Sequence, residues 1–151
     1  MASKNATRPA DSAASAEPRL FTVESANKSL VLVRRIVRDI AAVYADFMRL
    51  RTEAEQATQA ANNREQLEAL QFQIEDRAAR LQMLQDELTG IGCELKDWAR
   101  GLVDFPAEHE GRKVCLCWTP DEPEVSFWHE WNAGFAGRRN IDGGFGAEKP
   151  E

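Results

Sequence analysis

The sequence predicts an α+β protein: a long antiparallel helical hairpin, coiled-coil-like, followed by a small antiparallel sheet of three to four strands. Two observations lead to this prediction. From Leu30 to Ile91, apolar residues recur every three or four positions, and neither Gly nor Pro interrupts the pattern before Gly90. After Gly92, apolar residues alternate with polar ones, a period of two that is typical of strands.

The hairpin is predicted over residues 22–91. Thr22 is a suitable N-cap for the first helix and Phe21 a hydrophobic staple, although Ser25 is not the Glu or Gln of a full capping box. We expect the turn at Asn62-Asn63, after a polar and alanine-rich stretch. The apolar stripes of the two arms comprise Leu30, Val33, Val37, Ile40, Tyr44 and Phe47 in the first and Leu67, Leu70, Ile74, Leu81, Leu84, Leu88 and Ile91 in the second.

The length of the hairpin predicts a partner. Arms of roughly 28 residues, at 1.5 Å per residue, give a hairpin of about 40 Å, which is more than the roughly 50 remaining residues would cover. Within the heptad spacing of the second stripe, only Arg77 replaces an apolar residue. We therefore expect a homo-oligomer, a dimer in which two hairpins form a four-helix arrangement.

Residues 93–142 are predicted to form the sheet. Strands are expected at residues 102–108, 112–118 and 124–131, with 93–97 as a short fourth strand and Glu110-Gly111 as a tight turn. If both loops hold an even number of residues, one face of the sheet is apolar and packs against the hairpin. The residues of this face are Val103, Phe105, Ala107, Val114, Leu116, Trp118, Val125 and Phe127.

The opposite face of the sheet is mixed in character and is the candidate ligand-binding surface. The same register places Asp104, Glu108, Cys115, Cys117, Trp128 and Glu130 on it. Carboxylates and thiols on a half-covered surface fit a ligand site, although they also fit the plain outer face of a small sheet. The candidate ligand-binding residues are Asp104, Cys117, His129, Glu130 and Arg138. No residue is assigned a catalytic role.

No metal centre is assigned, and the cofactor is unknown. Cys115 and Cys117 lie on one side of a strand, and Cys93 and His129 are the further ligands that a zinc site would use. The even register places His129 on the side opposite to both thiols, which disfavours this site and also a Cys117–His129 nucleophile pair. A carboxylate site stays open as an alternative, with the ligands Asp104, Glu130 and Asp97.

Residues 134–139 form a glycine-hinged loop that presents two arginines. Arg138 and Arg139 suit a phosphate or carboxylate ligand, and backbone N–H groups beside glycines add to such an anion site. The interpretation we favour is that Arg138 closes the fold by pairing with Asp104 or Asp142. No Walker A or dinucleotide-binding motif is present.

Composition limits the function classes further. A net charge of −6 argues against nucleic acid as a partner. No apolar run approaches the roughly 20 residues that span a bilayer, and residues 1–20 lack the apolar centre of a signal peptide. The three cysteines suit reduced thiols. We expect a cytoplasmic protein with a disordered tail over residues 1–19, one domain over 20–142 and a flexible tail over 143–151.

Several short motifs resemble one known family. FTVESANKSL at residues 21–30 is followed by GLVDFPA at 101–107, LCW at 116–118, WHE at 128–130 and GFAGR at 134–138. This order and spacing resemble the prokaryotic family named domain of unknown function 2203, over residues 21–142. The resemblance implies a bacterial cytosolic protein and no particular activity. The chain departs from the family pattern at Ser25, at Arg139 and Asn140, where we expect Gln and Pro, and at Cys115, where a bulkier residue is common.

The sequence therefore predicts a protein of unknown function that is best interpreted as a module without enzymatic activity, which self-associates or binds a partner through its helical hairpin. The alternative is a small metal- or anion-binding protein, or an enzyme, that uses the mixed face of the sheet.

Overall fold

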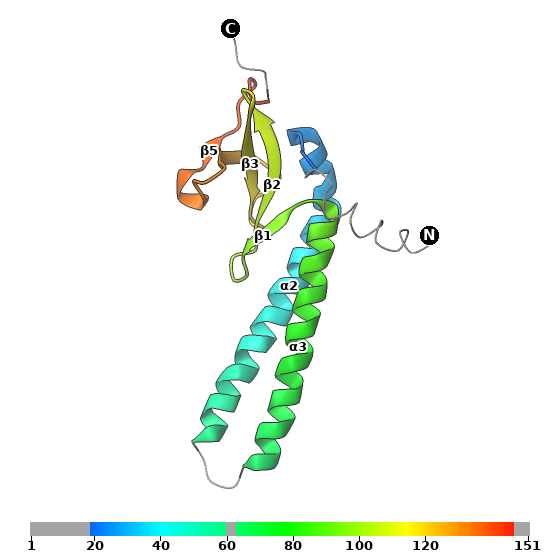
Figure 1. The fold of residues 1–151 in the computed structure, drawn as a ribbon, viewed down its shortest axis with the longest axis vertical. Coiled ribbons are helices and arrows are strands. Elements are labelled where there is room, and N and C mark those ends of the chain that lie inside the picture. The colour runs from blue at the N-terminus through cyan, green and yellow to red at the C-terminus, as the bar shows by residue number, and fades with distance from the viewer. Residues whose placement is uncertain (1–18, 60–62, 147–151) are drawn as a thin grey trace, which may run out of the picture.

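The computed structural model describes residues 19–59 and 63–146 and confirms the predicted α+β fold. Helices α2 (Val23–Thr58) and α3 (Arg64–Ile91) form an antiparallel hairpin. The strands that follow are β1 (Glu94–Asp97), β2 (Leu102–His109), β3 (Arg112–Trp118), β4 (Phe127–Glu130) and β5 (Arg139–Asn140). The sheet lies at one end of the hairpin, and the other end projects well beyond it (Figure 1). Residues 1–18 of the tail predicted over 1–19, the turn residue Asn62 and residues 147–151 lie outside the described residues.

The first helix begins at the predicted N-cap. The Thr22 hydroxyl accepts a hydrogen bond from the Ser25 N–H at 3.0 Å, and the Ser25 hydroxyl accepts one from the Thr22 N–H at 2.9 Å. Ser25 thus completes a capping box in place of Glu or Gln. At the other end of the hairpin sequence, α3 stops at Gly92, whose φ of 112° lies in the left-handed region that glycine tolerates.

Arg77, the polar residue of the second stripe, pairs across the hairpin. Its Nε donates to Oδ2 of Asp46 on α2 at 2.6 Å. The hydrogen bonds from Arg77 and then Arg49 hold the pKa of the Asp46 carboxyl below its ordinary value. The position that breaks the apolar heptad is therefore occupied by an ion pair between the two helices.

The sheet is an antiparallel meander in which the strands lie in sequence order, β1 to β5. Strands β2 and β3 pair in the predicted register, with Val103 opposite Trp118 and Phe105 opposite Leu116. These side chains are buried against Leu30, Val33, Leu84 and Leu88 of the hairpin in one core. The two-residue strand β5 was not predicted, because two residues carry no detectable period.

The predicted orientation of β4 is wrong by one residue. Trp128 lies opposite Leu116 and belongs to the core, whereas Phe127 lies opposite Cys117 and faces the other side of the sheet. The strand begins only at Phe127. Before it, the N–H of Val125 donates to Oδ1 of Asn27 on α2 at 2.7 Å, and this contact turns Val125 into the core. The alternation of sides therefore does not run through Ser126.

Two aromatic residues at the edges of the domain add to the core. The Phe21 N–H donates to the carbonyl oxygen of Pro106 at 2.7 Å, which forms an isolated parallel bridge beside β2. Near the other end of the chain, the ring of Phe145 stacks on that of His109 with centroids 4.7 Å apart, and it also contacts Trp128. The flexible tail was expected from residue 143, but packing against the core extends to Phe145.

Candidate functional site

The face of the sheet away from the hairpin brings three of the five candidate residues together. Asp104 on β2 lies opposite Cys117 on β3, and Cys115 lies opposite His129 on β4. Residues two apart on a strand share a face, so all four side chains project from the same side. One ligand atom each of Asp104, Cys117 and His129 lies within 4.8 Å of the other two. We call these three residues the polar cluster.

The polar cluster is fully enclosed. Asp104, Cys117 and His129 are 4%, 0% and 1% exposed. The imidazole Nδ1 of His129 lies 2.7 Å from the carbonyl oxygen of Glu130, and its Nε2 lies 3.1 Å from Oδ1 of Asp104. A carbonyl oxygen only accepts hydrogen bonds, so Nδ1 carries a proton. Its Nε2 faces the Asp104 carboxylate.

The thiols of this face are held in the neutral form. Burial, and next the negative charge of Asp104, raise the pKa of both Cys115 and Cys117 to about 12. A neutral thiol is a poor nucleophile. The sequence argument against a Cys117–His129 nucleophile pair placed the two side chains on opposite faces, but they share a face. The protonated thiol of Cys117 nevertheless gives a nucleophilic role no support.

Arg138 covers one side of the polar cluster. It follows the 3-10 helix η1 (Phe135–Gly137), and its guanidinium group lies 4.1 Å from the centre of the Phe127 ring. Its Nη1 and Nη2 donate to the two carboxylate oxygens of Glu122 at 2.7 and 2.8 Å, and Nη2 also donates to the Cys117 carbonyl oxygen at 3.1 Å. Arg138 thus closes the fold, as we favoured.

The predicted partners of Arg138, Asp104 and Asp142, are wrong. Glu122 takes their place because a tight turn at residues 119–122 brings it back to the sheet, where its Oε1 also accepts from the Thr119 N–H at 3.0 Å. In the sequence, the feature that could have indicated this ion pair was the position of Glu122 in a Pro-rich turn.

Glu130 and Trp128 lie on the face opposite to the one predicted. The register of β4 places Glu130 opposite Val114, at the rim of the hairpin side of the sheet. There it accepts hydrogen bonds from Nε and Nη2 of Arg112 at 2.9 and 2.5 Å, which hold its pKa below the ordinary value. The alternative carboxylate site is therefore wrong as well. Asp97, its third member, instead accepts from the N–H groups of Ala99 and Arg100.

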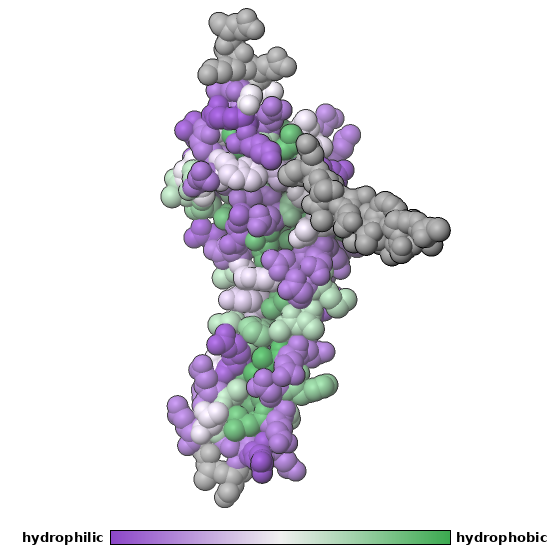
Figure 2. Space-filling model, viewed as in Figure 1, coloured by the Kyte–Doolittle hydropathy of each residue, from purple (hydrophilic) through white to green (hydrophobic). Residues whose placement is uncertain are grey.

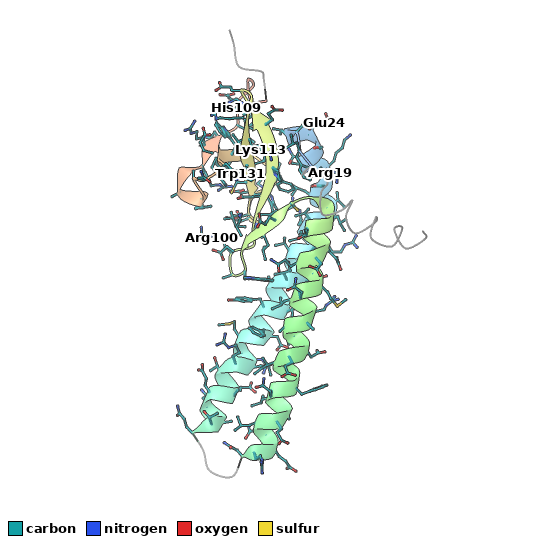
Figure 3. The ribbon with its side chains drawn as sticks, viewed as in Figure 1. Arg19, Glu24, Arg100, His109, Lys113 and Trp131 are labelled. Atoms are coloured by element: carbon teal, nitrogen blue, oxygen red, sulfur yellow. The ribbon has the colours of Figure 1, made fainter. Side chains whose placement is uncertain are left out.

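Cation–aromatic contacts line the margin of the polar-cluster face. The Lys113 ammonium lies 5.7 Å from the centre of the half-exposed Trp131 ring, and the two side chains are close together in Figure 3. Arg100, from the loop after β1, lies 4.4 Å from the centre of the Phe135 ring. The contact of Arg100 with Phe135 ties η1 to the loop after β1.

A second surface feature was missed in the sequence. Phe72, Asp76, Ala79, Arg80 and Met83 form what we call the outer stripe of α3. Phe72 and Met83 are 73% and 56% exposed, although both are large and apolar. The spacing of four, three and four from Phe72 to Met83 places the stripe on one side of the helix. A shallow groove of about 380 Å³ adjoins it beside Val43. Figure 2 shows apolar surface along the hairpin.

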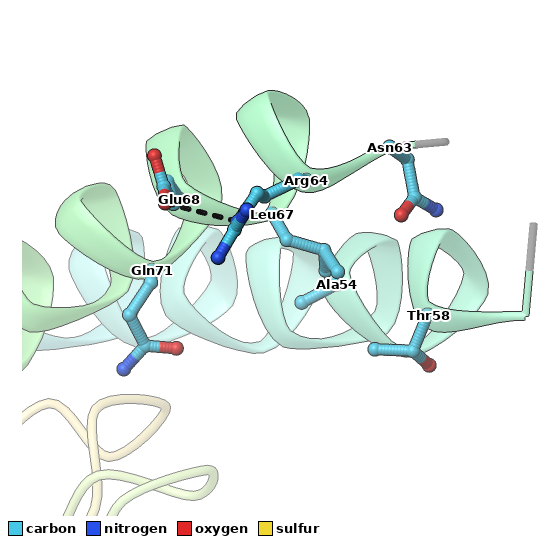
Figure 4. A pocket seen from close by; sticks show the side chains of 7 residues that line it. All are labelled: Ala54, Thr58, Asn63, Arg64, Leu67, Glu68 and Gln71. Atoms are coloured by element: carbon cyan, nitrogen blue, oxygen red, sulfur yellow. Dashed lines mark ion pairs between the residues drawn. The ribbon is translucent and has the colours of Figure 1, made fainter. Parts of the chain in front are cut away.

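A hollow lies at the far tip of the hairpin (Figure 4). It has a volume of about 670 Å³ and is lined by Ala54, Leu67 and Gln71 among others, with Arg64 and Glu68 paired at 3.9 Å on its rim. Both charges of this pair are largely exposed, so the pair contributes little to binding or stability. Nδ2 of Asn63, which also lines this hollow, is buried and makes no hydrogen bond to the residues that the structure describes.

The fold and the site define a class of protein: an α+β domain in which a helical hairpin supports a five-stranded antiparallel meander with an enclosed polar cluster on its far face. The chain belongs to the DUF2203 family. The family model described as "Uncharacterized conserved protein (DUF2203)" matches residues 19–141, which confirms the resemblance of the sequence motifs. No curated protein and no solved structure matches the chain.

Neither α2 nor α3, nor any other helix in residues 19–59 and 63–146, combines the length and the apolar character that crossing a membrane requires.

Proposed function

We propose that this protein is a module without enzymatic activity that forms a homodimer through the outer stripe of α3. The observation that supports this proposal best is the exposure of Phe72 and Met83, at 73% and 56%, on one side of a helix. The two side chains lie on the same side of α3 with the small Ala79 between them, and apolar surface exposed in this way favours an interaction site. The inner seam of the hairpin, which the sequence suggested as the interface, is already filled, since Leu81 and Leu88 are buried.

A second copy of the chain fits the outer stripe because the stripe is complementary to itself. Two antiparallel copies of α3, related by a two-fold axis between Asp76 and Ala79, place Phe72 opposite the partner's Met83. The same symmetry places Asp76 beside the partner's Arg80, which gives an ion pair on each side of the axis. Ala79 has a small side chain, so the two backbones come close at the axis.

The position of the stripe favours this arrangement. It runs along the middle of α3, where the hairpin emerges from beside the sheet (Figure 1). Within one chain, Asp76 accepts a hydrogen bond from Nη1 of Arg77 at 2.6 Å, but the carboxylate is 62% exposed. An ion pair at such an exposed site contributes little. Its carboxylate therefore stays accessible to an arginine of a second copy.

The oligomeric state tests the proposal. We expect light scattering coupled to size-exclusion chromatography to give twice the chain mass at micromolar concentration, and we expect Phe72→Glu to give the mass of one chain. Val31→Glu is the matched control, since Val31 is 77% exposed on α2 outside the stripe. Its substitution should leave the dimer intact. A monomeric wild type, or a dimer that survives Phe72→Glu, contradicts the proposal.

A charge exchange tests the antiparallel symmetry itself. Asp76→Arg and Arg80→Asp each place like charges across the two-fold axis and should weaken the dimer by about tenfold or more, since like-charge juxtaposition costs several kcal/mol. The double variant restores opposite charges on each side of the axis. Its dissociation constant should return close to that of the wild type, as measured by sedimentation equilibrium. A double variant as weak as the two single variants contradicts this symmetry.

The setting we propose is the bacterial cytoplasm. Cys93, Cys115 and Cys117 are free and buried, which suits a reducing compartment, and the resemblance to a prokaryotic family supports this setting. The net charge of −6 supports a partner other than nucleic acid. The alternative of anion binding by residues 134–139 has less support, because the Arg138 guanidinium already donates to Glu122.

A further inference from the structure

We infer that Asp104, Cys117 and His129 form a binding site for one divalent transition-metal ion of the zinc type. The inference goes beyond dimerisation and depends on a different part of the molecule. Its basis is geometric: the three side chains come from three adjacent strands, and one ligand atom of each lies within 4.8 Å of the other two. Ligands of a tetrahedral zinc ion are about 3.3 to 3.8 Å apart, given bonds of 2.0 to 2.3 Å. Small side-chain rotations close the difference.

The orientation of His129 is that of a metal ligand. Its Nδ1–H donates to the carbonyl oxygen of Glu130 at 2.7 Å, and its Nε2 points to Asp104 at 3.1 Å. Histidines that bind metals nearly always donate their second ring N–H to a carbonyl or carboxylate, which fixes the tautomer and the ring plane. The Nε2 lone pair is then directed to the same place as the Asp104 carboxylate.

The choice of ligands sets the class of metal. A thiolate with an imidazole suits zinc, cobalt and related ions, whereas magnesium and calcium prefer oxygen ligands only. A dication with one thiolate, one carboxylate and one neutral imidazole has no net charge. Such a centre places a positive charge beside the Asp104 carboxylate, which is only 4% exposed and whose charge is costly to bury. The nearby charge of Arg138 is compensated by Glu122 at 2.7 Å.

The enclosure of the site favours a structural role for the metal over a catalytic one. The side chains of Asp104 and His129 are 6% and 2% exposed, so no open side admits a substrate. Binding displaces the thiol proton of Cys117. The metal joins β2, β3 and β4 on the face that the hairpin does not support. We therefore expect it to stabilise the sheet end of the molecule.

Cobalt titration of the reduced, full-length protein tests the inference. Co²⁺ alone is added after chelator treatment and desalting, and absorption by the thiolate-to-cobalt transition is recorded. We expect one Co²⁺ per chain, displacement by Zn²⁺, and a higher melting temperature with either metal. Folded wild type that shows no thiolate-to-cobalt absorption at excess Co²⁺ overturns the inference. This result is independent of oligomeric state, so it is distinguishable from a failure of the dimer proposal.

Cys117→Ser and Cys115→Ser form a matched pair of variants. Both change a buried thiol on the same face of β3, two residues apart. We expect Cys117→Ser to lose the thiolate-to-cobalt absorption and to bind at least about 100-fold more weakly, since even changes behind the ligands cost 10- to 100-fold. Cys115→Ser should keep both the absorption and the stoichiometry. Absorption that survives Cys117→Ser, or that depends equally on Cys115, overturns the three-ligand assignment.

Should Cys117→Ser fail to fold, the wild type still decides the question. Zinc should slow alkylation of Cys117 more than that of Cys115 and Cys93 under mildly destabilising conditions, as followed by mass spectrometry. Equal protection of the three thiols overturns the assignment of Cys117 as the ligand.

Discussion

The two ends of the helical hairpin are held by different contacts. At the sheet end, Leu88 is completely buried and belongs to the same core as Val103 and Phe105. At the outer end, Leu70 is buried only against Leu50, Ala57 and their neighbours in the two helices, in a small separate cluster. One end of the hairpin is thus stabilised by its own sheet, while the other lacks such support and presents the exposed outer stripe nearby.

The largest effect is expected at the sheet end. Phe105→Ala removes a fully buried ring that contacts Phe21 edge to face at 5.1 Å. It should lower the free energy of unfolding by about 3 to 5 kcal/mol, the range for deletion of a buried aromatic side chain. Chemical denaturation followed by circular dichroism measures it. A loss below about 1 kcal/mol would mean that the hairpin does not depend on the sheet.

Two leucine substitutions compare the ends directly. Leu88→Ala and Leu70→Ala both fall within the range of about 2 to 5 kcal/mol for buried leucines. We expect Leu88→Ala to lose stability near the top of this range and Leu70→Ala near the bottom. The two helices can close around the side chain lost at Leu70 more easily than the core shared by the hairpin and the sheet can close around the one lost at Leu88. Denaturation of both variants, measured below the dissociation constant of the dimer, separates them. Equal losses would remove the difference between the ends.

The sequence predicted the sheet end of the molecule better than the outer end of the hairpin. The periods of 3.6 and two located both helices and strands β1 to β4, and the register of β2 and β3 followed from alternation. The orientation of β4 could not be predicted, because it depends on the contact between Val125 and Asn27, which are 98 residues apart. For the same reason, His129 was placed on the wrong side, so its proximity to Asp104 and Cys117 was not predicted, although all three residues were named as candidates. The outer stripe could have been detected from the spacing of its residues. It was overlooked because the apolar pattern of the inner seam is stronger.

Substitution of two arginines compares a largely buried ion pair with a more exposed one. In the pair formed by Arg138 and Glu122, the side chains are 11% and 16% exposed, against 42% and 35% for Arg112 and Glu130. Arg138→Ala should cost about 1 to 3 kcal/mol, because it leaves Glu122 and the Cys117 carbonyl without their donor. Arg112→Ala should produce no measurable change in stability, since water solvates the Glu130 carboxylate in place of the arginine. Thermal melts at low salt test both, and an unchanged midpoint for Arg138→Ala contradicts the closing role.

The smallest expected effect concerns acid and the ion pair of the hairpin. The pKa of Asp46 is lowered from 3.8 in the folded protein, first by Arg77. Above pH 3.8 the carboxyl is ionised in both states and its contribution is complete. As the pH falls below this value, the unfolded chain takes up the proton first, so stability is lost. Asp46→Asn should flatten this decline in melts between pH 5 and pH 2, and an identical slope contradicts the prediction.

Pro106 has a consequence for how molecules of this protein avoid joining through their sheets. Beyond the short strand β1, the one pairing on the outer side of β2 within residues 19–59 and 63–146 is that of Phe21 with the carbonyl oxygen of Pro106. The N–H and C=O of a strand residue point to the same side, so the donor that proline lacks is missing from this open edge. An incoming strand would find one acceptor already used and one donor absent. This edge is thereby protected against strand addition and the aggregation that follows from it.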